Sequence, residues 1–310
     1  MWYLRCEWVV PVMRQLIFTL VGLLAVIHAA AAVELNTLRV NPAEDFNSPY
    51  ALKMLELVNQ KLDWKYTVEI VDDGVTTKSR IVQNVVDGNY HVFWNSTNAE
   101  NEETLLPIRI PLFKGLLGHR IFIIREGEQD KFDQIKTIDE LRKVSMGTGA
   151  AWGDTSILSA NGMNLVLSNN YPSMFIMLDG NRFDAFPRGV FEAFKEVEDN
   201  EELGLAVEKN ILLVYKMPYY FFVNRDNKEL ADDLTRGLEM AIEDGSFDQL
   251  FLNFPTVQDA INKANLQDRR IFNLTNYSLS KETPLDRPEL WVDVKSMCIP
   301  QQNSPKLTAE

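Results

Sequence analysis

The alternation of strand-like and helix-like segments constrains the fold of this chain more than any other feature. Residues 36–41, 65–71 and 90–95 are short runs rich in β-forming residues, and the middle run alternates apolar with polar side chains. A helix that begins at Ser48 and a helical stretch over 76–88 separate these three strands. A βαβαβ order of this kind predicts an α/β fold with a parallel sheet and helices on its faces.

The alternation continues to about residue 255. Thr137 and Glu140 have the spacing of a capping box, which predicts the start of a helix. From residue 280 onward Pro, Lys, Asp and Gln are frequent, and this composition predicts disorder in the last ten residues. The other expected segments are strands at 120–126, 164–168, 211–215 and 219–224, helices at 171–180, from Asn227 and over 247–254, and a strand, glycine loop and helix across 144–162.

Composition excludes several classes of function. The 310 residues carry a formal net charge of −13, whereas a nucleic-acid-binding protein needs a basic face. The histidines and cysteines do not stand in the spacing of a metal site, and no nucleotide-binding fingerprint is readable. We therefore expect neither nucleic acid as a partner nor a metal or organic cofactor.

The N-terminal segment has the pattern of a secretory signal peptide. Arg14 precedes the apolar run 16–27, and small residues follow where a signal peptidase cleaves. The alternative is a membrane anchor, but the apolar run is short for a span across a bilayer. We expect residues 1–32 to be removed, with cleavage after Ala31 or Ala32.

Three motifs further along the chain carry a family resemblance. A glycine loop at 147–155, a turn and strand at 180–186 and the run 242–251 follow the signal peptide and the βαβαβ opening in that order. In these parts the chain resembles the type II periplasmic solute-binding proteins, the superfamily that contains the amino-acid-binding receptors of ABC importers. The resemblance covers roughly residues 34–255 and is to a divergent, transporter-type subgroup.

The resemblance implies a two-lobed α/β fold of the periplasmic-binding-protein type II. Each lobe would be a mostly parallel sheet flanked by helices, with two crossover strands as the hinge. Lobe 1 would comprise residues 33–116 and 217–279, lobe 2 residues 117–216, and residues 280–310 a partly disordered C-terminal extension. The resemblance also implies a monomer in the periplasm that captures a solute between its lobes for a membrane permease or a sensor.

The chain departs from the amino-acid receptors at their two usual ligand contacts. Their arginine for the ligand carboxylate corresponds to Asn101, and their aspartate for the ligand amine corresponds to Gly189. A standard free amino acid is therefore not the expected ligand. Arg188, at a strand-to-helix junction, becomes the main candidate, because a guanidinium and helix-end amides together suit a carboxylate. The alternative is an ion pair with Glu192, four residues further on.

The remaining candidates lie in segments expected to face the cleft, and each has a structural alternative. The tryptophans would stack on a ligand or fill the core, and the arginine would face the cleft or solvent. The polar residues would bond a ligand group, although the aspartate suits a helix cap as well. These candidates are Arg109, Trp152, Trp94, Thr148, Ser96, Asn95 and Asp154.

These observations favour a protein without chemistry of its own that binds a small anionic or polar solute carrying a carboxylate. One alternative is an enzyme on the same scaffold, such as a dehydratase acting on a carboxylated ring, with Asp154 and Glu192 as acid–base candidates. A second alternative is a protein that acts through protein contacts and takes no small ligand.

Overall fold

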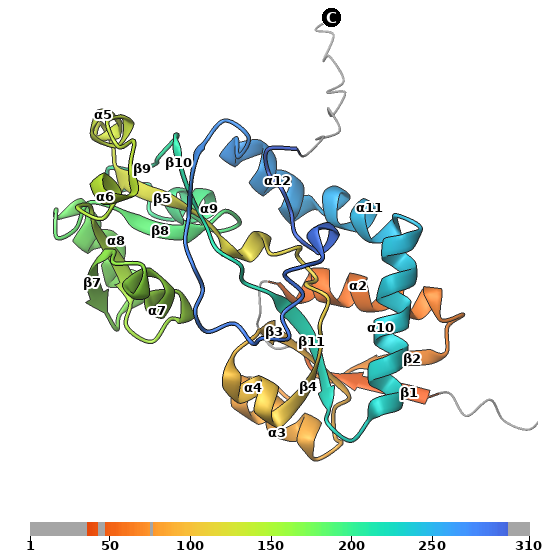
Figure 1. Cartoon of the computed structure of the whole chain (residues 1–310). Helices are drawn as coiled ribbons and strands as arrows, with labels where there is room; N and C mark the ends of the chain where they lie inside the picture. Colours follow the sequence, from red (N-terminus) through yellow and green to blue (C-terminus); the bar gives the residue numbers. More distant parts are fainter. Residues whose placement is uncertain (1–35, 43–46, 75–76, 297–310) are drawn as a thin grey trace, which may run out of the picture. The chain divides into compact units, whose positions relative to one another are not determined.

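The computed structural model of the protein describes residues 36–42, 47–74 and 77–296 (Figure 1). The predicted signal peptide at 1–32 and the predicted disorder of the last ten residues lie outside this described part. Within it, no helix combines the length and apolar character needed to cross a membrane. The described residues form a mixed α/β structure with two lobes, each with its own sheet.

The first lobe is built on a three-stranded sheet in the order β3-β11-β4. Strand β11 runs antiparallel to both neighbours, with Phe221 opposite Trp94 in β3 and Ile108 in β4. This direction differs from the mostly parallel sheet expected for each lobe, because β11 enters the sheet from the second lobe. β1 and β2 pair separately, and the amide of His91 donates to the carbonyl of Arg39 in β1. The strands are β1 (Asn36–Val40), β2 (Tyr66–Ile70), β3 (Val92–Ser96), β4 (Leu105–Ile108) and β11 (Tyr219–Asn224).

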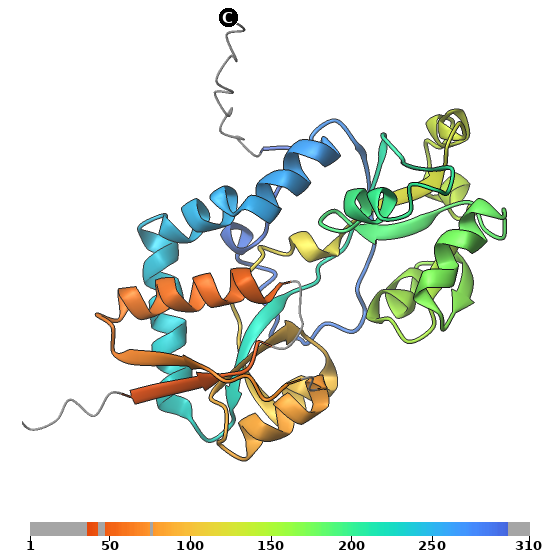
Figure 2. The same ribbon diagram turned by 180° about the vertical axis from the view of Figure 1, so that it is seen from behind.

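Alternating side chains of this sheet enter two different cores, as the two faces of a strand require. Trp94 and Phe221 belong to the large core that contains the apolar stripes of α2 and α10, two helices that contact each other and cross in both views (Figures 1 and 2). Phe93 and Phe222 instead pack with Ile81 of α3. The helices of this part of the chain are α2 (Ser48–Lys61), α3 (Lys78–Val86), α4 (Ala99–Thr104), α10 (Lys228–Glu243), α11 (Ser246–Asn253) and α12 (Pro255–Ala264).

The second lobe is built around β5, which pairs antiparallel with β8, β9 and β10. Ile121 and Ile123 enter one core and Phe122 and Ile124 another, so both faces are covered and the strand reads as a continuous apolar run. β12 extends the sheet as a parallel neighbour of β10, and β6 pairs in parallel with β7. The strands are β5 (His119–Arg125), β6 (Ser145–Gly149), β7 (Asn164–Ser168), β8 (Phe186–Gly189), β9 (Leu205–Val207), β10 (Ile211–Val214) and β12 (Arg270–Asn273).

The helices of the second lobe are short. The predicted capping box at Thr137 is confirmed, because its hydroxyl accepts from the amide of Glu140 while the Glu140 carboxylate accepts from the amide of Thr137. These helices are α5 (Gln129–Asp133), α6 (Ile138–Leu141), α7 (Gly153–Ala160), α8 (Tyr171–Asp179) and α9 (Ala193–Glu198).

Two elements near the C-terminus were not predicted. Pro255 ends the predicted apolar helix, but it also occupies the first position of α12, where its missing amide hydrogen is no loss. β12 is a four-residue segment in which Arg270 and Asn273 flank two apolar residues, a pattern too short to indicate a strand. Its conformation depends on its pairing with β10, which sequence alone does not show.

Candidate functional site

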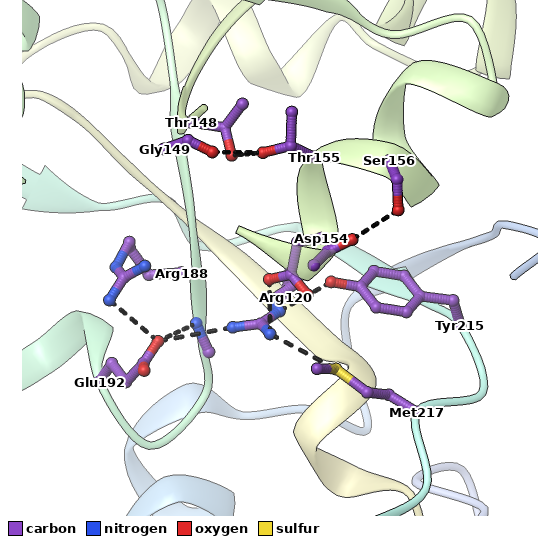
Figure 3. A network of polar contacts seen from close by, with 12 residues as sticks. Arg120, Thr148, Gly149, Asp154, Thr155, Ser156, Arg188, Glu192, Tyr215 and Met217 are labelled. Carbon is purple, nitrogen blue, oxygen red and sulfur yellow. Dashed lines mark hydrogen bonds and ion pairs between the residues drawn. The ribbon is translucent and has the colours of Figure 1, made fainter. Parts of the chain in front are cut away.

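Five charged side chains of the second lobe gather near the start of β5 and the end of β8, and we call them the arginine–carboxylate cluster; Figure 3 labels four of them. β5 and β8 contribute one arginine each, α7 contributes an aspartate from its first turn, and the segment that begins α9 contributes two glutamates. The cluster therefore combines two guanidinium groups with three carboxylates, a formal excess of one negative charge. Its members are Arg120, Arg188, Asp154, Glu192 and Glu196.

Arg188 is held mainly by Glu196. Its Nε donates to both carboxylate oxygens at 3.0 and 2.7 Å, and its Nη2 donates to Oε1 at 2.6 Å. The Oε2 of Glu192 lies 3.2 Å from the same Nη2, and the hydroxyl of Tyr171 donates to Glu196 at 2.7 Å. Arg188 is only 8% exposed, and the central carbon of its guanidinium lies 4.8 Å from the centre of the Trp152 ring. The charge of Arg188 is thus already compensated inside the lobe.

The electrostatics of Arg188 and Glu192 agree with this geometry. Burial alone would lower the pKa of Arg188, but Glu192 and Glu196 more than offset it and hold the pKa above its usual value. Burial would raise the pKa of Glu192, yet Arg188 and Arg120 more than offset it and hold that pKa below its usual value. Both groups are therefore charged at neutral pH, and the predicted pair of Arg188 with Glu192 is present.

Arg120 was not singled out from the sequence, because it stands at the start of an apolar strand. In the structure it is buried, and its Nη2 lies 2.6 Å from Oδ2 of Asp154. Its Nε donates to the hydroxyl of Tyr215 at 2.8 Å, and its Nη1 lies 3.5 Å from Glu192, at the limit of a hydrogen bond (Figure 3). The other oxygen of Asp154, Oδ1, is buried and has no hydrogen-bond partner among the described residues. A signal for Arg120 would have been an arginine inside a strand that is otherwise buried throughout.

Thr148 and Trp152 of the glycine loop, which were expected to face the cleft, pack against neighbouring side chains of the second lobe. Thr148 is 2% exposed, and its hydroxyl lies 2.8 Å from that of Thr155, which itself donates to the carbonyl of Gly149 (Figure 3). Trp152 stacks on Phe186 at 6.1 Å between ring centroids and covers Gly149, leaving no room there for a side chain. The cap residue of α7 is Trp152, so Asp154 does not cap this helix. Trp152 therefore forms a wall of the cluster beside Arg188.

The candidates of the first lobe take different positions. Trp94 is 3% exposed and its indole nitrogen donates to Ser48, so it packs in the core. Asn95, next to Ser96 at the end of β3, accepts from the ammonium of Lys78.

Arg109 lies just past β4, in a set of contacts of its own. Its Nη2 donates to Glu102 at 2.9 Å and to Glu282 at 2.5 Å, whereas its buried Nη1 has no hydrogen-bond partner in the described chain. Burial alone would lower the pKa of Arg109, but the two glutamates more than offset it and raise the pKa.

The described residues show no group of three or more His, Cys, Asp or Glu side chains placed to hold a metal ion. The arginine–carboxylate cluster brings carboxylate oxygens, aromatic rings and guanidinium groups together in one place.

The described residues have the two-lobed α/β fold of the type II periplasmic solute-binding proteins, as the sequence predicted. No family model matches the chain, and no curated protein matches it. Among solved structures, it is similar to the probable amino-acid ABC transporter extracellular-binding protein ytmK from Bacillus subtilis. The two are 15% identical, with a TM-score of 0.54 over 73% of this chain and 100% of that one.

Two further similar structures are reconstructed ancestral proteins. One is an ancestral arginine-binding protein bound to arginine, 19% identical, with a TM-score of 0.45 over 70% of this chain and 96% of that one. The other is the ancestral amino-acid-binding protein AncCDT-1, a precursor of cyclohexadienyl dehydratase. It is 18% identical, with a TM-score of 0.45 over 70% of this chain and 93% of that one.

Proposed function

We propose that the protein is an exported solute-binding protein that captures a small polar solute between its lobes and delivers it to a membrane permease or a sensor. The fold shared with a transporter-binding protein supports this proposal, as does the pattern of the N-terminal segment. The site we propose in the second lobe is the arginine–carboxylate cluster with Trp152 beside it. The single observation that carries the proposal is the unpartnered, buried Oδ1 of Asp154.

We infer from this oxygen the chemical group of the solute that the cluster meets. A buried carboxylate oxygen without a donor costs free energy, about 1–3 kcal/mol, and a bound donor would remove that cost. The cluster has one carboxylate more than it has guanidinium groups, so an incoming carboxylate would be repelled. A solute that bears an ammonium, amidine or guanidinium group would instead complete the hydrogen bonds of Asp154. This proposal replaces the carboxylate contact predicted at Arg188, because the guanidinium of Arg188 already donates hydrogen bonds to Glu196.

We also infer that the protein binds its solute without transforming it. The two acid–base candidates, Asp154 and Glu192, each lie beside an arginine, at 2.6 Å from Arg120 and 3.2 Å from Arg188. For Glu192, burial is more than offset by Arg188 and Arg120, which hold its pKa below the usual value, so it is a weak proton acceptor and does not suit a general base. The appearance of a product after incubation with a bound solute would instead favour the enzyme.

The experiment is a thermal-shift comparison of the native protein with Asp154→Asn. The solutes are small amines, amidines and basic amino acids, with matched carboxylates that lack an amino group. A true ligand at a hundredfold excess over its Kd should stabilise the native protein by about 2.7 kcal/mol.

Asp139→Asn is the matched control, because Asp139 also lies in the first turn of a lobe-2 helix and pairs with an arginine, but at the surface. Asp154→Asn should lose the shift while the control keeps it. Stabilisation by the carboxylates alone, unaffected by Asp154→Asn, would contradict the proposal.

A further inference from the structure

The chain crosses between the two lobes at two neighbouring segments that form the hinge. The segment 109–118 leads from β4 to β5, and the segment 215–218 leads from β10 to β11. The two are joined by their backbones, because the amide of Tyr215 donates to the carbonyl of Gly118 at 3.0 Å. A side chain at Gly118 would overlap the carbonyl oxygen of Tyr215, so the contact requires glycine.

After α12 the chain returns to the second lobe and then comes back to the first, which adds a second pair of crossings. β12 pairs with β10 over residues 270–273, and the amide of Leu274 extends the pairing by donating to Val214. Asn276 then donates from its side chain to the carbonyl of Lys216, inside the hinge. We call residues 274–294, which follow β12, the C-terminal strap; they lie in the blue part of the chain in Figure 1.

The far end of the strap is anchored on the first lobe. Arg287 makes a two-pronged contact with Glu239 of α10, at 2.5 and 2.8 Å. The amide of Val292 donates to the carbonyl of Lys114, which lies in the hinge segment 109–118. The strap therefore touches the second lobe at its beginning, the first lobe at its end and the hinge in between.

Trp291 is the strap residue in closest contact with the hinge. It is 6% exposed, and its indole nitrogen donates to the carbonyl of Pro284 within the strap. Gly115 has a φ of +73°, and a Cβ placed there would lie 2.6 Å from a ring carbon of Trp291. The ammonium of Lys216 lies 4.6 Å from the centre of the same ring. Trp291 thus packs on both hinge segments at once.

We propose that the C-terminal strap is a brace that restrains the motion of one lobe against the other, with Trp291 as the contact that resists bending of the hinge. Hinge motion changes φ and ψ at a few residues between rigid bodies. A rotation at Gly115 has to displace the Trp291 ring, and a separation of the lobes has to stretch the strap between β12 and Arg287. This inference goes beyond solute binding and does not depend on which solute binds.

The test measures the distance between the lobes without any solute. The exposed residues Gln60 in α2 and Ser159 in α7 are each changed to cysteine and labelled with a nitroxide. Pulsed electron–electron double resonance then gives the distribution of distances between the two labels. The chain's own cysteines, Cys6 and Cys298, are changed to serine.

A specific protease site is inserted between Ser278 and Leu279, so that one sample is measured before and after the strap is cut. The control carries the same site between Glu201 and Glu202, an exposed turn within the second lobe. Trp291→Ala supplies a second, uncut variant.

The brace predicts a broader distance distribution after the strap is cut, after Trp291→Ala, or after both, and no change after the control cut. If neither change broadens the distribution beyond the control, the brace is overturned. Because the readout needs no ligand, this result stands apart from the outcome of the solute-binding tests.

Discussion

The buried pair of Arg188 and Glu196 gives the most quantitative test of the second lobe. Glu196→Ala removes three hydrogen bonds from Arg188 and one from Tyr171. It leaves the guanidinium of Arg188, a residue that is only 8% exposed, without its main partner. Removing one partner of a buried ion pair costs about 3–5 kcal/mol. Glu192 remains 3.2 Å from Arg188 and compensates part of the charge, so we expect a loss of about 3 kcal/mol.

The assay is reversible thermal or urea unfolding, compared between the native protein and the variant. A loss of about 3 kcal/mol corresponds to a melting temperature lower by about 6–12 °C for a chain of this size class. Glu56→Ala is the control, since Glu56 forms an exposed pair with Lys53 that should contribute less than about 1 kcal/mol. If Glu196→Ala costs no more than this control, then Glu196 does not hold Arg188 as described, and Arg188 becomes available again as a ligand contact.

Two further predictions concern the hinge. Gly115 and Gly127 both have positive φ, but a Cβ at Gly127 meets no atom within 4 Å, whereas one at Gly115 would overlap the ring of Trp291. Gly127→Ala should therefore lower the free energy of unfolding by about 1–2 kcal/mol, and Gly115→Ala by about 1–3 kcal/mol more. Equal losses in urea unfolding would show that the Trp291 ring moves aside at no cost. His119 is buried beside the carbonyl of Gly115, and burial lowers its pKa to about 4. The unfolded histidine takes up its proton near pH 6.5, so stability should be complete above that pH and fall by about 3 kcal/mol as the pH drops to 4. His119→Gln should remove this part of the pH dependence, and an unchanged profile would show that the pKa of the histidine is the same in the folded and the unfolded protein.

Much of the fold could be predicted from the sequence, because most strands and helices carry their own periodic patterns. The strand at 120–126 and the helix from Asn227 are found within a residue or two of the predicted positions. α12 and β12 were missed, because Pro255 marks the end of one helix and the start of another, and β12 becomes a strand through its neighbour.

The site was harder to predict than the fold. The position of Arg188 at a strand end was visible, but its main partner, Glu196, stands 8 residues further on in α9, and the sequence predicted only the pair with Glu192. Arg120 and Asp154 come from different elements, and sequence alone does not show that they meet. Side chains converge at a site through tertiary packing, whereas periodicity reports one element at a time.

In the site we propose, the cluster around Asp154 receives a positively charged, hydrogen-bond-donating group of the solute. The most direct measurement is isothermal titration calorimetry with a solute found by thermal shift and with its N-acetylated analogue. We predict that acetylation, which removes the charge of the amine, weakens binding to the native protein at least about tenfold, or about 1.4 kcal/mol, and has little further effect in Asp154→Asn. Equal affinity of the two forms for the native protein would contradict the claim.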